Sequence, residues 1–198
     1  DESGNVTDTT WHSPEYDKWN RLISYKVKKK NSTGVVTTEE TWNTLDKYGR
    51  AVNSKTRYAD GIGVTTEEDT TYIYNNKNQV INSSTIRKDP TGLISLKESS
   101  FTYDKYGRVA RTNNTYTQAI DGNNLTTKEE VTYTYYNSFS KVKSQFVKKV
   151  DAVGIETLSE TSYEYNFQNL LSRAVAIYTE YVLTENNSDG TRANTITN

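Results

Sequence analysis

The fold is decided by a short stretch that occurs twice, once as Tyr103-Asp104-Lys105-Tyr106-Gly107-Arg108 and once as Leu45-Asp46-Lys47-Tyr48-Gly49-Arg50. The two copies match at five of six positions and lie 58 residues apart, which is twice 29. Self-similarity at a fixed period of this size indicates repeated supersecondary units. Stepping by 29 residues, with one insertion of four, gives six units, and their anchor positions are Tyr16, Leu45, Tyr74, Tyr103, Tyr136 and Tyr165.

Each unit has a turn signal directly after its anchor. The next residue is Asp or Asn in all six units, and the residue three positions further on is mostly Gly or Asn. Asp and Asn side chains can bond the backbone, and Gly and Asn tolerate a positive φ angle, so the pattern predicts a type I turn that closes with a left-handed residue. A second turn falls half a period away, at 31–34, 60–63, 89–92, 121–124 and 151–154.

The stretches between turns predict strands. Segments such as 64–74, 93–103 and 155–165 are rich in Thr, Tyr and charged residues, a composition that favours half-buried strands over helices. Each unit is therefore expected to be a β-hairpin, and hairpins joined head to tail make an antiparallel meander of about 11 or 12 strands. The predicted fold class is all-β, with 1–198 as a single repeat domain.

The core is expected to be thin, because only 33% of the residues are hydrophobic and segment 64–71 is polar on both faces. We expect an extended, twisted and largely single-layer sheet that is stabilised by cross-strand pairs. A meander that curls onto itself is the alternative.

The two ends differ from the middle, as the capping units of repeat proteins do. Segment 6–16 predicts a first edge strand, where Pro14 is tolerated because an edge residue need not donate to the ladder. Segment 169–182 is the most apolar stretch; the period favours a strand there, while its apolar spacing also fits a helix. Residues 186–198 are expected to be a ragged last strand or a flexible tail.

Composition narrows the classes of partner and cofactor. The 24 basic and 25 acidic residues nearly cancel, which removes the simplest argument for a nucleic-acid partner. No apolar run approaches the roughly 18 residues that a membrane-spanning helix needs. The chain has no cysteine and one histidine, so no disulfide, thiolate site or multi-histidine metal site is expected, and no cofactor is predicted. The absence of methionine at position 1 leads us to expect a removed export signal.

Aromatic residues are the candidate binding surface. The row consists of anchors and of residues two positions earlier on the same strand face: Tyr72, Tyr74, Phe101, Tyr103, Tyr136, Tyr163 and Tyr165. Equivalent rings are expected two strands apart, at about 9.5 Å, where they could stack on sugars or contact a protein. Four further rings lie in the predicted turns, and they are Trp19, Tyr48, Tyr106 and Phe139. Packing over neighbouring strands explains the row better than binding does, and packing over the adjacent turn explains the rings in the turns as well as binding does.

Acidic pairs recur on one strand of several hairpins, at Glu39-Glu40, Glu67-Glu68 and Glu129-Glu130. In a glycosidase two carboxylates act together on one substrate. Consecutive residues of a strand point to opposite faces, so these pairs cannot converge in that way. Cross-strand pairing with the basic residues of the other strand explains them better, and no enzyme activity is predicted.

The segment Tyr103 to Val109 resembles the YD repeat of the Rhs family, whose units read Tyr-Asp, two variable residues, Gly-Arg and an apolar residue. Leu45 to Ala51 matches with Leu in place of Tyr, and the other units keep a degenerate form, so the resemblance covers about a quarter of the chain. It implies a secreted or surface-associated protein built from continuous β-hairpins. The period is longer than the usual YD unit, and six units are too few for the closed shell of long members. The chain is more similar to short exported YD-like proteins of Gram-negative bacteria, for which no activity is implied.

These observations predict a non-enzymatic exported repeat protein, located in the periplasm, on the outer surface or outside the cell. It would act as a structural or interaction module, through a sheet face or by strand addition at an open edge. A carbohydrate-binding module that uses the tyrosine row is the alternative. The partner is therefore expected to be a protein or a glycan, and open edge strands make a homo-oligomer plausible.

Overall fold

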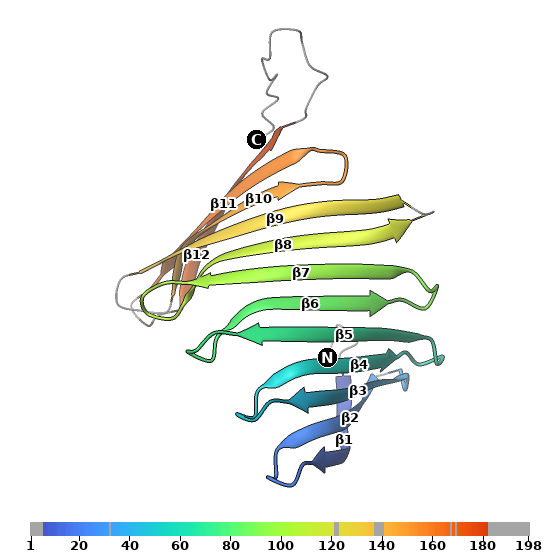
Figure 1. Ribbon diagram of the computed structural model, residues 1–198. Coiled ribbons are helices and arrows are strands. Elements are labelled where there is room, and N and C mark those ends of the chain that lie inside the picture. Colours follow the sequence, from blue (N-terminus) through green and yellow to red (C-terminus); the bar gives the residue numbers. More distant parts are fainter. Residues whose placement is uncertain are drawn as a thin grey trace. The chain divides into compact units, whose positions relative to one another are not determined.

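The computed structural model describes residues 6–31, 33–120, 123–136, 141–166, 168 and 170–181. Over these ranges the chain is all-β and contains no helix, and hence none that could cross a bilayer. The strands belong to one sheet and follow one another in chain order from β1 to β12 (Figure 1). The predicted meander of hairpins is therefore confirmed.

The strand bounds agree with the predicted turns except at 121–124, where a strand already begins at Asn123. The strands are β1 (Val6–Tyr16), β2 (Leu22–Asn31), β3 (Val36–Leu45), β4 (Ala51–Ala59), β5 (Thr65–Tyr74), β6 (Val80–Lys88), β7 (Ile94–Tyr103), β8 (Val109–Ile120), β9 (Asn123–Tyr135), β10 (Val142–Val150), β11 (Glu156–Tyr165) and β12 (Leu171–Tyr181). The apolar segment for which strand and helix were both open is thus strand β12. The expectation for 186–198 concerns residues outside the described ranges.

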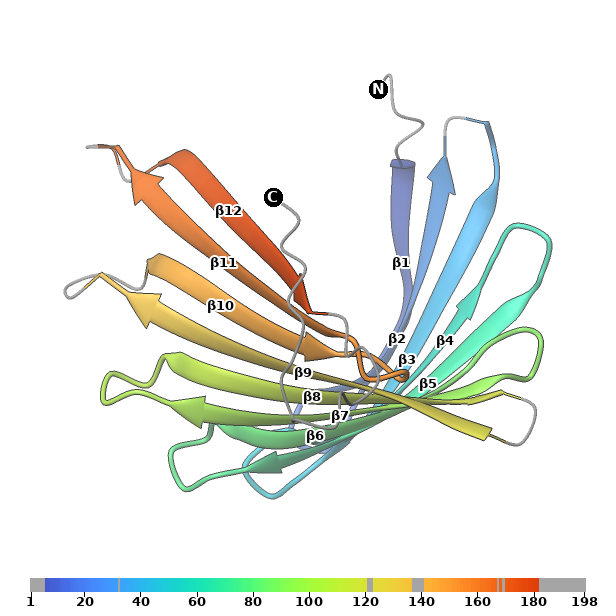
Figure 2. The ribbon, with the colours of Figure 1, turned by 90° about the horizontal axis from the view of Figure 1, so that it is seen from above.

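The chain divides into two compact units. The first holds β1 to β6, and the second holds β9 to β12; β7 and β8 contribute residues to both. Within the first unit each strand from β1 to β6 pairs antiparallel with the next, and Figure 1 shows them one beside the other. In the second unit β9 to β12 pair in the same way, which Figure 2 shows from above. Among the described residues each of these strands contacts its chain neighbours alone, so each set is a single layer.

The turns have the conformation that the sequence predicts. The fourth residue after the anchor has a positive φ angle, 61° at Asn20, 84° at Gly49 and 63° at Asn78. The Asx side chain organises the turn: in one example Asp46 Oδ1 accepts the backbone N–H groups of Tyr48 and Arg50 at 2.8 and 3.0 Å. The half-period turns are built alike, with Gly34, Gly63, Gly92 and Gly154 at φ angles of 85° to 90°.

The core is thin and largely polar, as expected for a single layer. Val27 and Val131 are the buried aliphatic side chains of the described part, at 4% and 6% exposure. Hydroxyl pairs take the place of apolar packing across several strand pairs, including Thr41 with Thr56 at 3.2 Å and Thr70 with Thr85 at 2.9 Å. Cross-strand pairs of this kind are worth about 0.2–1 kcal/mol each. Stability therefore comes from many small neighbour contacts.

Candidate functional site

A repeated ion pair closes the turns that follow the anchors. Arg50 donates from Nε and Nη2 to Oδ2 of Asp46, at 2.7 and 2.6 Å. The pairs Asp17 with Arg21 and Asp104 with Arg108 have the same geometry. Because both nitrogens bond one carboxylate, the guanidinium is fixed in place. We call each Asp–Arg pair, together with its turn, a turn clasp.

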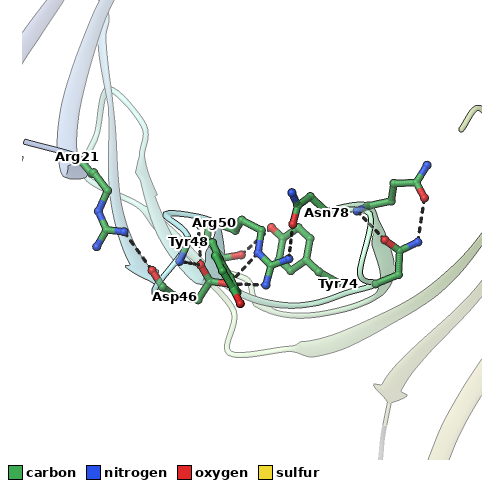
Figure 3. Close-up of polar contacts among 9 residues, drawn as sticks. Arg21, Asp46, Tyr48, Arg50, Tyr74 and Asn78 are labelled. Carbon is green, nitrogen blue, oxygen red and sulfur yellow. Dashed lines mark hydrogen bonds and ion pairs between the residues drawn. The ribbon is translucent and has the colours of Figure 1, made fainter. Parts of the chain in front are cut away.

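Each turn clasp also reaches the next turn of the same kind. Nη1 of Arg21 donates to the backbone oxygen of Asp46 at 3.1 Å, and Nη1 of Arg50 donates to Oδ1 of Asn78 at 2.8 Å (Figure 3). In the second unit Arg108 donates to the backbone oxygen of Tyr136 at 3.3 Å. The repeating arginine therefore joins one hairpin to the following one.

Aromatic rings contact the guanidinium groups of the turn clasps. Arg50 lies 5.0 Å from the ring centroid of Tyr48, in its own turn, and 4.6 Å from that of Tyr74, in the next unit (Figure 3). Tyr74 is itself fixed, because its hydroxyl donates to the backbone oxygen of Ala51 at 2.8 Å. Cation–π contacts of this kind add to the ion pair where solvent is partly excluded.

The carboxylates of the turn clasps are held in the ionised form. Partial burial raises the pKa of Asp46, but the backbone and side-chain hydrogen bonds from Arg50 outweigh it, so that the pKa lies below its ordinary value. The pKa values of Asp17 and Asp104 are lowered in the same way, by Arg21 and Arg108. A carboxylate with a lowered pKa and an arginine partner is a poor proton donor or acceptor near neutral pH.

The seven rings of the predicted row lie half-buried against neighbouring strands, whereas the anchor Tyr16 is 53% exposed. In the first unit Tyr72 and Tyr74 belong to β5, and burial raises the pKa of the Tyr74 phenol. Phe101 and Tyr103 lie near the end of β7 and are half-buried as well, and burial raises the pKa of Tyr103. This burial supports the packing interpretation of the row.

The remaining members of the row contact one another in the second unit. The hydroxyl of Tyr136 donates to the backbone oxygen of Tyr163 at 2.9 Å, and the Tyr136 and Tyr165 rings meet edge to face at 6.1 Å. The hydroxyl of Tyr163 bonds Oε1 of Gln145 at 3.2 Å. These three tyrosines therefore link strands and turns, which leaves less of each ring for a ligand.

Three of the four predicted turn rings, in contrast, are exposed: Trp19 by 65%, Tyr48 by 68% and Tyr106 by 62%. The fourth, Phe139, lies outside the described residues. The lysine that precedes each ring lies over it, with Nζ 4.2 to 4.9 Å from the ring centroid. Each ring therefore carries a lysine as well as the arginine of its turn clasp. We call Trp19, Tyr48 and Tyr106 with these lysines the turn rings.

In the fifth unit the anchor lies one residue earlier than the repeat spacing predicts. Tyr135 pairs with Val142 at the end of its hairpin, where Tyr74 pairs with Val80. The hydroxyl of Tyr135 donates to the backbone oxygen of Val109 at 2.7 Å, as that of Tyr74 does to Ala51. Tyr135 therefore occupies the anchor place that the spacing assigned to Tyr136.

Sequence reasoning also missed a hollow on one face of the first unit. Its lining includes Trp42 of β3, Lys55 of β4, Asp69 of β5 and Ile86 of β6. These residues are cross-strand partners in one row, and Nζ of Lys55 lies 3.4 Å from a carboxylate oxygen of Asp69. Trp42 has no aromatic equivalent in most other units, so repetition gave no signal.

The acidic pairs lie where the charge-pairing interpretation requires. Glu39 pairs with Lys29 at 3.5 Å, Glu40 with Lys26, and Glu68 with Arg87 at 3.5 Å. In the second unit Glu130 pairs with Arg111 at 3.5 Å. Each of these contacts is cross-strand and partly exposed, so each contributes little by itself.

No family model matches the chain, and no curated protein matches it either.

Proposed function

We propose that this chain is a non-enzymatic, exported β-repeat protein of the YD-like type that acts as a structural or protein-interaction module. One observation carries the proposal: the turn-clasp arginines Arg21 and Arg50 bond the turn of the following unit, and the anchor Tyr74 bonds the backbone of the preceding one. Residues used in this way hold repeats at a fixed spacing. They are the parts of a scaffold rather than of a reaction centre.

The charge state of the acidic groups supports the same conclusion. The turn-clasp carboxylates have lowered pKa values, and the glutamates named above are paired across strands. General acid or base catalysis at neutral pH favours groups whose pKa lies near 7. The geometry therefore favours presentation of a surface over proton transfer.

The turn rings are a repeated, exposed part of the scaffold and are available to a partner. Trp19 and Tyr48 belong to successive units, two strands apart, which corresponds to about 9.5 Å. Aromatic side chains with nearby cations are frequent in the energetically dominant part of protein interfaces. A partner that contacts several units would bind through these rings at a regular spacing.

Site-specific photocrosslinking in the producing cells tests this role. A photoreactive amino acid in place of Trp19 or Tyr48 is expected to give the same adduct, of one defined mass, identified by mass spectrometry. Phe146 is the matched control, because it is an aromatic side chain, 39% exposed, in the middle of β10 and away from the turns. Equal adducts from all three positions, or none from the turns, would contradict the proposal. Cell fractionation of the same strain tests the export.

A carbohydrate-binding module is the second candidate, and the exposure of the turn rings favours it. The spacing between equivalent rings is close to the length of a disaccharide, so each unit could stack one sugar pair of an extended polymer. A glycan array tests it with the wild type and with Tyr48→Ala plus Trp19→Ala. Binding that survives in Tyr72→Ala plus Tyr74→Ala but is lost in the turn-ring variant would support it, and a blank array would remove it.

A further inference from the structure

The strand order begins with β1 and ends with β12, and these two edge strands differ in regularity. β1 pairs with β2 through three register irregularities, and it carries Ser13 at a φ angle of 49° followed by Pro14. Bulges, proline and short regular runs are the features that keep an edge strand from pairing with another chain. β1 has all of these features.

β12 lacks the proline and the repeated irregularities of β1. It pairs with β11 without interruption from Arg173 to Tyr181, and its one register shift lies at its start. It contains no proline, lysine or glycine. Within the part of the chain that the structure describes, β11 is its partner strand and its other edge is unpaired.

β12 carries exposed apolar side chains on both faces, beside the polar Ser172, Arg173 and Thr179. Leu171 is exposed by 57%, Val175 by 40%, Ile177 by 62% and Tyr178 by 62%. Strands elsewhere in the sheet carry mostly Thr, Ser, Lys and Glu at comparable positions. A long, regular and apolar edge is a template for the addition of a further strand.

We propose that the strand added to β12 is β12 of a second copy of this chain, in antiparallel orientation. The dimer axis is a two-fold axis normal to the sheet that passes Ala176, the central residue of the strand. The proposal rests on the interaction role above and gives it one defined partner. With such an axis the same face of both sheets lies on the same side of the combined sheet. The two copies use the same surface, so the dimer is isologous and closed.

Side-chain complementarity in this register supports the proposal. Val175 lies opposite Ile177 of the second copy, and the symmetry repeats this β-branched pair. On the other face the small Ala174 lies opposite the large Tyr178, and Ala176 at the axis leaves room for both rings. Cross-strand pairs of β-branched and aromatic residues are the ones that stabilise sheets.

Other arrangements of two edges are less favourable. A parallel pair of two β12 edges needs a two-fold rotation about the strand direction, which turns the second sheet over. The Val175 and Ile177 face of one copy would then lie beside the Ala174 and Tyr178 face of the other, and parallel pairing is slightly less stable per residue. The antiparallel pair places Arg173 opposite Thr179. Pairing of β12 with β1 would be heterologous and open-ended, and the irregular β1 is a poor template for it.

The small area of the proposed β12–β12 interface sets the affinity that we expect for the dimer. One added strand of 11 residues buries less than the roughly 1,600 Å² of a standard interface. We therefore expect a reversible dimer with a micromolar dissociation constant.

A single cysteine tests the register, because the natural chain has none. Opposed Cα atoms in an antiparallel pair lie about 4.5–5.5 Å apart, within the roughly 4.4–6.8 Å that a disulfide spans. Full-length Ala176→Cys is expected to form a covalent dimer under mild oxidation. Arg173→Cys is the matched control, since the two cysteines would lie six residues apart, about 20 Å. No dimer from Ala176→Cys, or equal dimer from both variants, overturns the proposed register.

Charged substitutions on β12 test the proposed dimer interface without a cross-link. Sedimentation at micromolar concentrations is expected to show loss of the dimer in Val175→Lys plus Ile177→Lys. The dimer should persist in Ile73→Lys plus Ile86→Lys, whose parent side chains are similarly exposed in the first unit. A wild type that is monomeric throughout overturns the proposal, and so does dimerisation that appears only when 182–198 is deleted, because the chain would then cover its own edge.

Photocrosslinking from the turn rings is independent of these outcomes, so failure of self-pairing and failure of the proposed function are distinguishable.

Discussion

Arg50 and Asn78 lie 28 residues apart in the chain, yet Nη1 of the arginine donates to Oδ1 of the asparagine at 2.8 Å. The same arginine is fixed by its ion pair with Asp46. One side chain therefore closes its own turn and joins it to the next. The relationship makes the turn clasp a link between hairpins, and its energetic value can be measured.

A double-mutant cycle between Arg50→Lys and Asn78→Gly measures this link. Glycine suits the φ angle of 63° at position 78, and lysine keeps the charge at position 50 without the planar fork. We expect a coupling energy of about 0.5–1 kcal/mol from urea denaturation, because one partly exposed hydrogen bond is lost. Arg21→Lys with Asn78→Gly is the control cycle and should be additive. Additivity in both cycles would mean that the contact contributes nothing.

Tyr74→Phe removes one hydroxyl that donates to the backbone oxygen of Ala51. The ring keeps its place against Arg50, so we expect a loss of about 1 kcal/mol in the free energy of unfolding. Tyr48→Phe is the matched control and should change stability by less than about 0.5 kcal/mol, because that ring is 68% exposed. Equal effects of the two changes would argue against a linking role for the Tyr74 hydroxyl.

The turn-clasp carboxylates predict sensitivity to acid. The pKa values of Asp46 and Asp104 are lowered in the folded chain, so their contribution is fully present above the unfolded value of about 3.9 and is lost as the pH falls through the lower folded values. Asp46→Asn plus Asp104→Asn is expected to be less stable than the wild type at pH 7. The difference should shrink below about pH 4. Denaturation midpoints measured across this range check the sign, and a constant difference would contradict it.

The thin core predicts one sensitive aliphatic position in the first unit. Val27 is 4% exposed, and Val27→Ala removes two methyl groups, for which we expect a loss of about 1.5 kcal/mol. Ile73→Ala removes more carbon from a side chain that is 57% exposed, and it should cost less than about 0.5 kcal/mol. The comparison is made by denaturation of both variants. A larger loss from Ile73→Ala would show that burial does not decide these effects.

Much of the fold could be predicted from the sequence because turn chemistry is local. An Asx residue and a residue of positive φ, three positions apart, define each turn within a few atoms, so Asp46 and Gly49 predict it without knowledge of the neighbours. The predicted first strand, 6–16, matches β1 to the residue. The meander then follows from turns at regular spacing.

The parts of the site that depend on neighbouring hairpins could not be predicted in this way. The choice between Tyr135 and Tyr136 depends on the pairing with Val142, since both are tyrosines beside the turn. One signal was available: Arg stands four residues after Asp in three units, a spacing compatible with an ion pair. The contact from Arg50 to Asn78 needs the register of two hairpins, and the row that holds Trp42 needs four strands.

Through its arginine each turn clasp bonds the turn of the following unit, and this has a consequence for how such chains change in evolution. Duplication or loss of one 29-residue segment would leave the remaining clasps with equivalent partners. The sheet would then grow or shrink by whole hairpins, and the contacts between the remaining hairpins would stay the same. Changes in the number of repeats in the gene would therefore produce shorter and longer proteins with the same fold.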